Sequence, residues 1–202
     1  MDSKYIKDTL NKHYKGAKCT LVFNSVYELV VATMLSAQTT DEKVNKVTAE
    51  LFKKYNGIEA IANAKQEDIY EYLKPLGLAN AKSKNLIRLS QIILTKYNGV
   101  VPNNKEELKK LPGVGEKVAE VVLAEGFGIP SFPVDTHVKR VSNRLGLVKE
   151  NDPIKIEAKL KAIFDKKDWI SLHHQLIAFG RDICKASKPE CSRCPFQGQC
   201  TK

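Results

Sequence analysis

The sequence predicts a protein built from α-helices. Most of its 202 residues fall in segments whose apolar positions recur every three or four residues, which is the spacing of one helical face. Residues that favour helix N-termini precede several of these segments. No long alternation of apolar and polar residues, the pattern of a half-buried strand, interrupts them.

The composition restricts the kind of partner. The chain carries 33 Lys and Arg against 23 Asp and Glu, a formal net charge of +10. This excess indicates a polyanionic partner, and composition alone leaves DNA, RNA and a membrane surface open. The longest apolar run, 29–35, is too short to span a bilayer, and no signal segment is recognisable. We expect a soluble, intracellular protein.

The first helices are indicated by their capping patterns. Residues 3–15 form an amphipathic segment with Ser3 as a possible cap. Ser25 and Glu28 then have the spacing of a capping box. They precede residues 29–35, which are apolar on nearly every side and therefore predict a central, buried helix.

The next segments alternate helices with turns. A second capping pattern starts at Thr39 and precedes a helix that should end near Gly57. Two short helices are expected over 58–73. A turn over 75–80 then leads into a long helix that ends at Tyr97.

Three further helices are expected towards the C-terminus. Asn104 is a candidate cap for a helix over 105–110. Asp152 followed by proline marks the start of a helix that reaches Phe164, and residues 169–183 form the last helical segment. That segment contains two adjacent histidines, which we expect to be packed or solvated.

The stretch 111–137 carries the first chemical signal. Pro112, Gly113 and Gly115 suit a tight turn between two helices. The free N–H groups and positive dipole end of the second helix would form a binding site for an anion such as a phosphate. Lys117 lies in the first turn of that helix, where the dipole disfavours its charged form and makes a neutral amine easier to reach.

Asp135 supplies a carboxylate eighteen residues after Lys117. If folding places this amine next to the carboxylate at a phosphate-binding site, the neutral amine could form a Schiff base with a sugar. The plainer alternatives are that Asp135 caps the helix 136–145 and that Lys117 is one more solvated lysine.

The second chemical signal is a set of cysteines near the C-terminus. Cys184, Cys191, Cys194 and Cys200 are separated by six, two and five residues. In a reducing compartment such a group indicates metal binding rather than disulfides, with either Zn²⁺ or an iron–sulfur cubane as the centre. The isolated Cys19 is expected to be a small buried hydrophobic residue.

Together these motifs resemble one protein family from end to end. Leu-Ser-Ala-Gln-Thr-Thr-Asp at 35–41, Leu-Pro-Gly-Val-Gly-Glu-Lys at 111–117, Val-Asp-Thr-His at 134–137 and the 6-2-5 cysteine spacing resemble the endonuclease III family of DNA glycosylases. The resemblance implies an all-α, helix-hairpin-helix DNA glycosylase fold. It also implies a six-helix domain over 20–130 and a second helical domain over 1–19 plus 131–202, with DNA in the cleft between them.

The resemblance also implies roles for individual residues. Lys117 and Asp135 would be catalytic, and the four cysteines would hold a [4Fe–4S] cluster, which the spacing favours over zinc. Gln38 would enter the gap left by an extruded base. Leu78 would wedge between bases, with core packing as the alternative. The remaining expected DNA contacts are Gly113, Val114, Gly115, His137, Lys188 and Arg193.

The implied activity is that of a bifunctional DNA glycosylase and AP lyase of base excision repair. The enzyme would remove oxidised pyrimidines through a lysine Schiff base and nick the strand by β-elimination. Its partner would be double-stranded DNA with damaged pyrimidines or abasic sites, bound by a cytoplasmic monomer that would be nucleoid-associated in a bacterium. A monofunctional glycosylase and a non-catalytic iron–sulfur DNA-binding protein are the alternatives.

The chain also departs from the expected pattern. Glu116 precedes the lysine where a neutral or basic residue was expected, and it would repel a nearby phosphate. Glu120 lies one turn after Lys117, where its charge could raise the pKa of the amine. Because few residues follow Cys200, we expect none of the extra recognition domain of adenine glycosylases.

Overall fold

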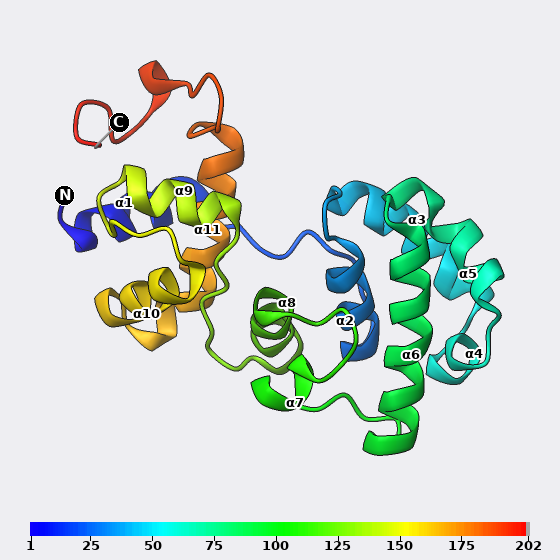
Figure 1. Cartoon of the computed structure of the whole chain (residues 1–202). Coiled ribbons are helices and arrows are strands. Elements are labelled where there is room, and N and C mark those ends of the chain that lie inside the picture. The colour runs from blue at the N-terminus through cyan, green and yellow to red at the C-terminus, as the bar shows by residue number, and fades with distance from the viewer. Residues whose placement is uncertain (201–202) are drawn as a thin grey trace. The chain divides into compact units, whose positions relative to one another are not determined.

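The computed structural model describes residues 1–200 and divides the chain into two packed units (Figure 1). The continuous unit comprises Thr20–Ile129. The discontinuous unit joins Met1–Cys19 to the chain from Pro130 onward. The described residues contain no strand and no helix long and apolar enough to cross a membrane.

The continuous unit consists of packed α-helices. It contains seven α-helices, of which α4 and α7 have five residues each. In chain order its elements are α2 (Val26–Leu35), α3 (Asp41–Lys54), α4 (Ile58–Ala62), α5 (Gln66–Leu73), η1 (Lys74–Leu76), α6 (Ala79–Tyr97), α7 (Lys105–Lys109), α8 (Glu116–Val121) and the π-helical turn η2 (Val122–Gly126).

Helix α2 forms the centre of this unit. All seven residues from Leu29 to Leu35 are buried, and the helix contacts α3, α6, α8 and η2. An apolar side chain stabilises the fold by roughly 1.5–3 kcal/mol when it is fully buried. The predicted central helix is therefore confirmed.

Two predicted caps are confirmed by their hydrogen bonds. Ser25 Oγ accepts from the backbone N–H of Glu28 at 3.1 Å, at the start of α2. Asn104 Oδ1 accepts from the backbone N–H of Glu107 at 2.9 Å, at the start of α7. Each bond satisfies one of the N–H groups that a helix N-terminus leaves without an intrahelical partner.

Two other predicted caps were wrong by one residue. Thr40, not Thr39, caps α3, with its Oγ1 accepting from the N–H of Lys43. This start places Asp41 in the first turn, where the helix dipole favours an acidic side chain. Asp2, not Ser3, caps α1 through its carboxylate.

The discontinuous unit is held together by its last helix. Its elements are α1 (Ser3–Tyr14), α9 (Thr136–Arg144), α10 (Pro153–Ile163), η3 (Lys166–Asp168), α11 (Trp169–Asp182) and η4 (Cys191–Arg193). Helix α11 contacts both α1 and α9. The N-terminal helix is fixed by the apolar burial of Ile6 and Leu10 and by an ion pair of 2.9 Å between Lys7 and Asp168.

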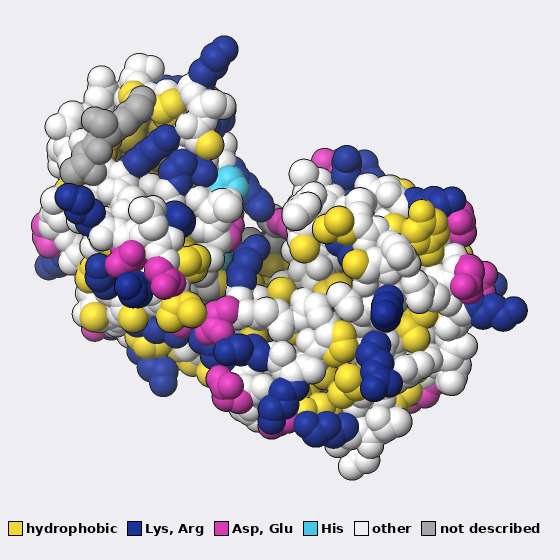
Figure 2. All heavy atoms as spheres, viewed as in Figure 1, with side chains coloured by type: hydrophobic (Ala, Val, Ile, Leu, Met, Phe, Trp, Pro, Cys, Tyr) yellow, Lys and Arg dark blue, Asp and Glu magenta, His cyan; other side chains and the backbone are white. Residues whose placement is uncertain are grey.

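The basic residues are distributed over both units. Figure 2 shows Lys and Arg side chains on the visible face of each unit, interspersed with Asp and Glu. On this face the basic side chains therefore occur on both units rather than on one of them.

Gly113 is the glycine with the strongest steric requirement. Its φ of +80° lies in the left-handed region, and a Cβ added to it would lie 2.8 Å from Met34 Cγ. A side chain at this position would therefore be strained and would also displace the residue that α2 presents to the turn.

Replacing Gly113 by alanine should destabilise the protein more than the same change at Gly128. Gly128 also has a positive φ, +63°, but nothing lies within 4 Å of an added Cβ. Gly128→Ala should lose about 1–2 kcal/mol from backbone strain. Gly113→Ala should lose about 1–3 kcal/mol more from overpacking. Urea unfolding measures both free energies, and equal losses would contradict the clash with Met34.

Candidate active site and cysteine loop

The glycine turn before α8 exposes its two glycines and Lys117. Gly113, Gly115 and Lys117 are solvent-exposed, and Lys117 is the second residue of α8. The side chain of Val114 is buried, and its backbone N–H donates to Leu111 O at 3.1 Å. Val114 therefore supports the turn from inside, whereas the glycines present backbone to solvent.

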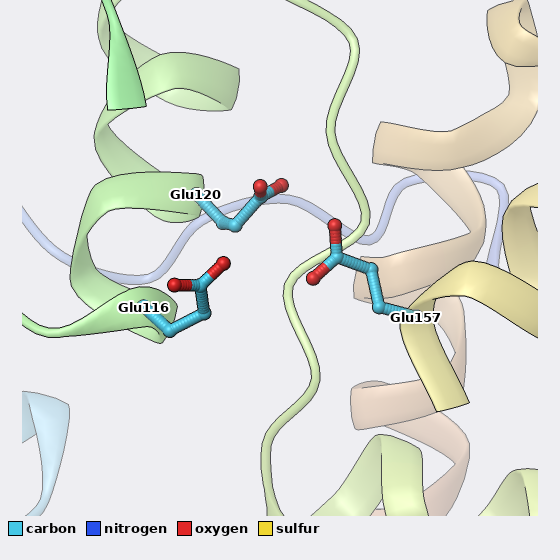
Figure 3. Close-up of side chains that lie close together, drawn as sticks. All are labelled: Glu116, Glu120 and Glu157. Atoms are coloured by element: carbon cyan, nitrogen blue, oxygen red, sulfur yellow. The ribbon is translucent and has the colours of Figure 1, made fainter. Parts of the chain in front are cut away.

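Two acidic residues follow the turn, and both are paired with lysines. Figure 3 shows Glu116 and Glu120 one turn apart on α8, with their carboxylates on the same side. Lys105 Nζ lies 2.6 Å from Glu120 Oε1 and also pairs with Glu116, while Lys109 Nζ lies 3.0 Å from Glu116 Oε2. The lysines of α7 thus offset the negative charge that the sequence placed beside Lys117.

The ion pairs also determine the ionisation of Glu116. Burial disfavours its carboxylate form, but the hydrogen bonds and charges of Lys105 and Lys109 outweigh burial and lower the pKa of Glu116. The carboxylate is therefore ionised at neutral pH, and its nearest cations are Lys105 and Lys109 rather than Lys117.

Asp135 is the N-cap of α9. Its Oδ1 accepts from the backbone N–H of Val138 at 2.8 Å, and the residue is half-buried. The capping interpretation is confirmed. The cap fixes the orientation of the carboxylate through one oxygen, Oδ1. The second oxygen has no part in the cap. Lys117 belongs to the continuous unit and Asp135 to the discontinuous unit.

Two arginines that the sequence motifs did not indicate connect α9 to the cysteine loop. Arg140 donates to Cys184 O and to Gly180 O, both at 3.0 Å. It also donates to His137 Nδ1 at 3.1 Å, which makes that ring nitrogen the acceptor. The burial needed for these contacts lowers the pKa of Arg140.

Arg144 continues this connection one turn later. Its guanidinium donates to Lys185 O at 2.8 Å and Ala186 O at 3.2 Å, and its Nη1 lies 3.5 Å from Cys184 Sγ. Residues four apart lie on the same helical face, so Arg140 and Arg144 bind the same segment. The two arginines spaced i,i+4 after Asp135 are the feature of the sequence from which this connection could have been predicted.

The four C-terminal cysteines line one pocket. None forms a disulfide, and the other lining residues are Arg144, Leu145, Phe179, Ile183 and Pro189. The backbone N–H of Phe196 lies 3.4 Å from Cys194 Sγ, and burial raises the pKa of the Cys194 thiol. Four sulfur donors in a largely apolar pocket fit a single soft metal centre. Cys19 lies apart from them in the sequence and is half-buried.

The three cations of the cysteine loop have different surroundings. Lys185 pairs with Glu190 at 2.5 Å, and Arg193 pairs with Glu190 and, at 3.7 Å, with Asp182. Lys188 is exposed and forms no ion pair with residues 1–200. Its charge is therefore the least neutralised of the three.

Gln38 and Leu78 share an uncommon backbone conformation. Both are exposed, with φ of 58° and 53°, and Leu78 is 56% exposed. Leu78 is therefore not a core residue, and the packing alternative was wrong. Residues 1–200 contain four non-glycine residues with positive φ, and the others are Lys188 and Asn98. Three of the four, Gln38, Leu78 and Lys188, are among the residues that the sequence predicted to contact DNA.

His173 has a packing role in the discontinuous unit. It is buried, and its Nδ1 lies 2.8 Å from Pro133 O, two residues before Asp135. Its ring also contacts that of His174 edge to face. The expectation that His173 is packed is confirmed.

Comparisons with known proteins identify the class of protein to which this fold belongs. Residues 31–166 match the family model of HhH-GPD superfamily base excision DNA repair proteins. Endonuclease III of Bacillus subtilis (strain 168) is 43% identical over 198 residues, covering 98% of this chain and 90% of that protein. Endonuclease III of Rickettsia felis is 44% identical over 195 residues, with coverages of 96% and 92%. The chain belongs to the endonuclease III family.

Solved structures agree with this assignment. A non-covalent endonuclease III–DNA complex and a trapped endonuclease III–DNA covalent intermediate each match with a TM-score of 0.95 and 41% identity. Each match covers 98% of this chain and 93% of the other. The predicted family and helix-hairpin-helix fold are confirmed, and the chain is a bifunctional DNA glycosylase and AP lyase of base excision repair.

Asp135 variants should separate capping from chemistry. Asp135→Asn keeps a capping oxygen and should retain most of the stability, whereas Asp135→Ala should lose about 1 kcal/mol. If the charge is needed for the reaction, both variants should lose activity. Urea unfolding and the rate of strand nicking on abasic-site DNA measure the two effects.

Asp152 provides the matched control. It caps α10 in the same unit by accepting from the N–H of Ile154 at 2.9 Å. Asp152→Ala should therefore lose similar stability and keep its activity. Full nicking activity in Asp135→Asn would show that Asp135 acts only as the cap of α9.

Proposed function

We propose that this enzyme removes oxidised pyrimidines from double-stranded DNA through a Schiff base on Lys117, with Asp135 as the second catalytic residue. The observation that carries the proposal is the exposed Lys117 at the start of α8, directly after the exposed glycine turn. A relative of this chain at 41% identity has been trapped as a covalent DNA intermediate. A covalent mechanism needs a nucleophile, and an exposed lysine amine at this motif position supplies one.

The first step is extrusion of the damaged nucleotide from the duplex. A damaged base pairs weakly, so removing it from the stack takes less free energy. Gln38 would enter the vacated position and Leu78 would wedge between neighbouring bases. Their exposure supports these roles because neither side chain must leave a protein core to reach DNA.

The covalent step follows at the sugar. The neutral amine of Lys117 attacks C1′, and the C1′–N bond breaks with its electron pair leaving on the base. Asp135 accepts the amine proton or stabilises the positive charge that develops on the sugar. Ring opening gives the Schiff base. Loss of a C2′ proton then expels the 3′ phosphate by β-elimination and nicks the strand.

Contacts with the DNA backbone would hold the duplex during these steps. The exposed backbone at Gly113 and Gly115 is suited to approach a phosphate closely, with Val114 supporting the turn. Among the loop cations, Lys188 is the strongest candidate for a phosphate contact because Arg193 is already paired with acids. His137, beside Asp135, would contact the same strand.

The cysteine pocket would hold a [4Fe–4S] cluster on Cys184, Cys191, Cys194 and Cys200. The donor set and the apolar lining fit a cluster, and the 6-2-5 spacing differs from the paired Cys-x2-Cys of zinc ribbons. When bound, the cluster would cross-link the loop rather than take part in bond cleavage at the sugar. The cross-linked loop would hold Lys188 towards the phosphates.

The two packed units would be the two domains of the enzyme, with Lys117 in the continuous unit and Asp135 in the discontinuous unit. The protein would act as a cytoplasmic monomer on the nucleoid, since its relatives include bacterial enzymes and its substrate would be genomic DNA.

Borohydride trapping tests the role of Lys117. The wild-type protein should form a trapped adduct on duplex DNA with a single oxidised pyrimidine or abasic site, because borohydride reduces a Schiff base to a stable amine. Lys117→Ala should form none. Lys54→Ala, which removes an exposed lysine of α3, should match the wild type. An undiminished adduct in Lys117→Ala would refute the mechanism.

The same assay distinguishes the alternative functions. A monofunctional glycosylase would release the base, leave the strand intact and form no adduct. A non-catalytic iron–sulfur protein would bind the DNA without either reaction. Repeating the assay with oligonucleotides that each carry one defined oxidised base gives the substrate range.

Metal analysis tests the cluster. The purified protein should be yellow-brown with about four irons per chain, whereas a zinc protein would be colourless. Cys194→Ser should lose the iron and colour because one of four ligands is removed. Cys19→Ser should retain both, since Cys19 lies outside the pocket. Stoichiometric zinc in the wild-type protein would refute the assignment.

A further inference from the structure

A buried lysine connects the two turns that carry Gln38 and Leu78. Lys82 lies in the first turn of α6 and is only 4% exposed. Its Nζ donates to Ala37 O at 2.9 Å and to Leu76 O at 3.0 Å. Both acceptors are backbone carbonyls, and no carboxylate among residues 1–200 forms an ion pair with this ammonium.

A buried ammonium at this position is unfavourable for the stability of the core. Lysine is almost never fully buried unless its charge has a partner. Burial lowers the pKa of Lys82, which shows that the surroundings disfavour the charge. An apolar side chain of similar size would fill the same space without that desolvation. The hydrogen bonds of Lys82, rather than its volume, therefore distinguish it from its apolar neighbours.

Those hydrogen bonds stabilise the C-terminal ends of two helices. Ala37 follows Ser36, the C-cap of α2, and Leu76 is the last residue of η1. Helix C-termini leave carbonyls without intrahelical partners and carry the negative end of the helix dipole. One cation satisfies both ends and thereby fixes the distance between them.

A non-glycine residue in the left-handed conformation follows each Lys82-bound carbonyl within two residues. Gln38 follows Ala37 with a φ of 58°, and Leu78 lies two residues after Leu76 with a φ of 53°. Such conformations persist in non-glycine residues only where the surrounding structure holds them. Lys82 Nζ donates to a backbone carbonyl in each of these two turns and so links them.

We propose that Lys82 is a positioning residue that ties the Gln38 turn to the Leu78 turn, so that both side chains enter the duplex together. The inference rests on the gap-filling roles proposed for Gln38 and Leu78. Lys82 would not contact the DNA itself. Its loss should impair the enzyme where a base must be extruded and the gap filled, while the chemistry at Lys117 is left intact.

The test compares Lys82→Met with Lys84→Met. Methionine keeps the length of the buried side chain but cannot donate, and Lys84 is exposed on the same helix, so its variant controls for the lost charge. Lys82→Met should excise an oxidised pyrimidine from duplex DNA roughly tenfold more slowly or worse, the effect of losing a hydrogen bond to a charged group. Lys84→Met should stay within about twofold of wild type at matched salt.

A background without the two gap-filling side chains distinguishes positioning from a general structural role. In Gln38→Ala/Leu78→Ala protein, adding Lys82→Met should change the excision rate by less than about twofold, because the residues through which Lys82 acts are gone. A structural role elsewhere would slow this background as much as the wild type. Fluorescence of 2-aminopurine opposite the lesion should also fall in Lys82→Met at saturating enzyme, reporting loss of gap filling.

The outcomes separate this inference from the proposed function. A wild-type protein that forms no trapped adduct refutes the proposed function. An active wild type with an unimpaired Lys82→Met, or a full tenfold loss in the double-variant background, overturns the role of Lys82. If Lys82→Met fails to fold, Lys82→Gln, whose side chain is shorter and uncharged, is judged by the same criteria, and Lys82→Arg should recover most of the rate.

Discussion

The burial of α2 is the constraint on which the continuous unit depends. Its seven consecutive buried residues leave no polar face, so the surrounding helices must enclose it. The same helix provides Met34, which packs against the glycine turn before Lys117, and ends beside the Gln38 turn. One apolar segment thus sets the position of two parts of the site, because both are attached to a helix that cannot shift without opening the core.

The proposed functional residues lie at helix ends rather than within helices. Gln38 follows α2, Leu78 precedes α6, Lys117 begins α8 and Asp135 caps α9. Helix ends have backbone groups without intrahelical partners, and the residues beside them can face solvent. Rigid helices therefore supply the precision of the site, while the chemistry is carried by residues that remain accessible.

The sequence predicted features that depend on local patterns. The buried helix, the caps at Ser25 and Asn104 and the gathering of four cysteines all follow from spacing along the chain. Contacts between distant segments were beyond this reasoning: the Lys105 and Lys109 pairs that offset the acids of α8, the two carbonyls bound by Lys82, and the arginines that hold the cysteine loop. A spacing rule gives the face of a helix, but it does not give the segment that packs on that face.

The anchoring of the cysteine loop has a consequence for how this protein can evolve. Arg140 and Arg144 bind the last turn of α11 and the start of the loop largely through main-chain oxygens, at Gly180, Cys184, Lys185 and Ala186. A carbonyl is present whatever side chain the residue bears, so mutations at Lys185 or Ala186 leave the attachment in place. The two arginines, Cys184 and Gly180, where an added Cβ would lie 3.1 Å from Arg140 Nη2, are then the constrained positions, while the side chains of Lys185 and Ala186 can vary without loss of the attachment.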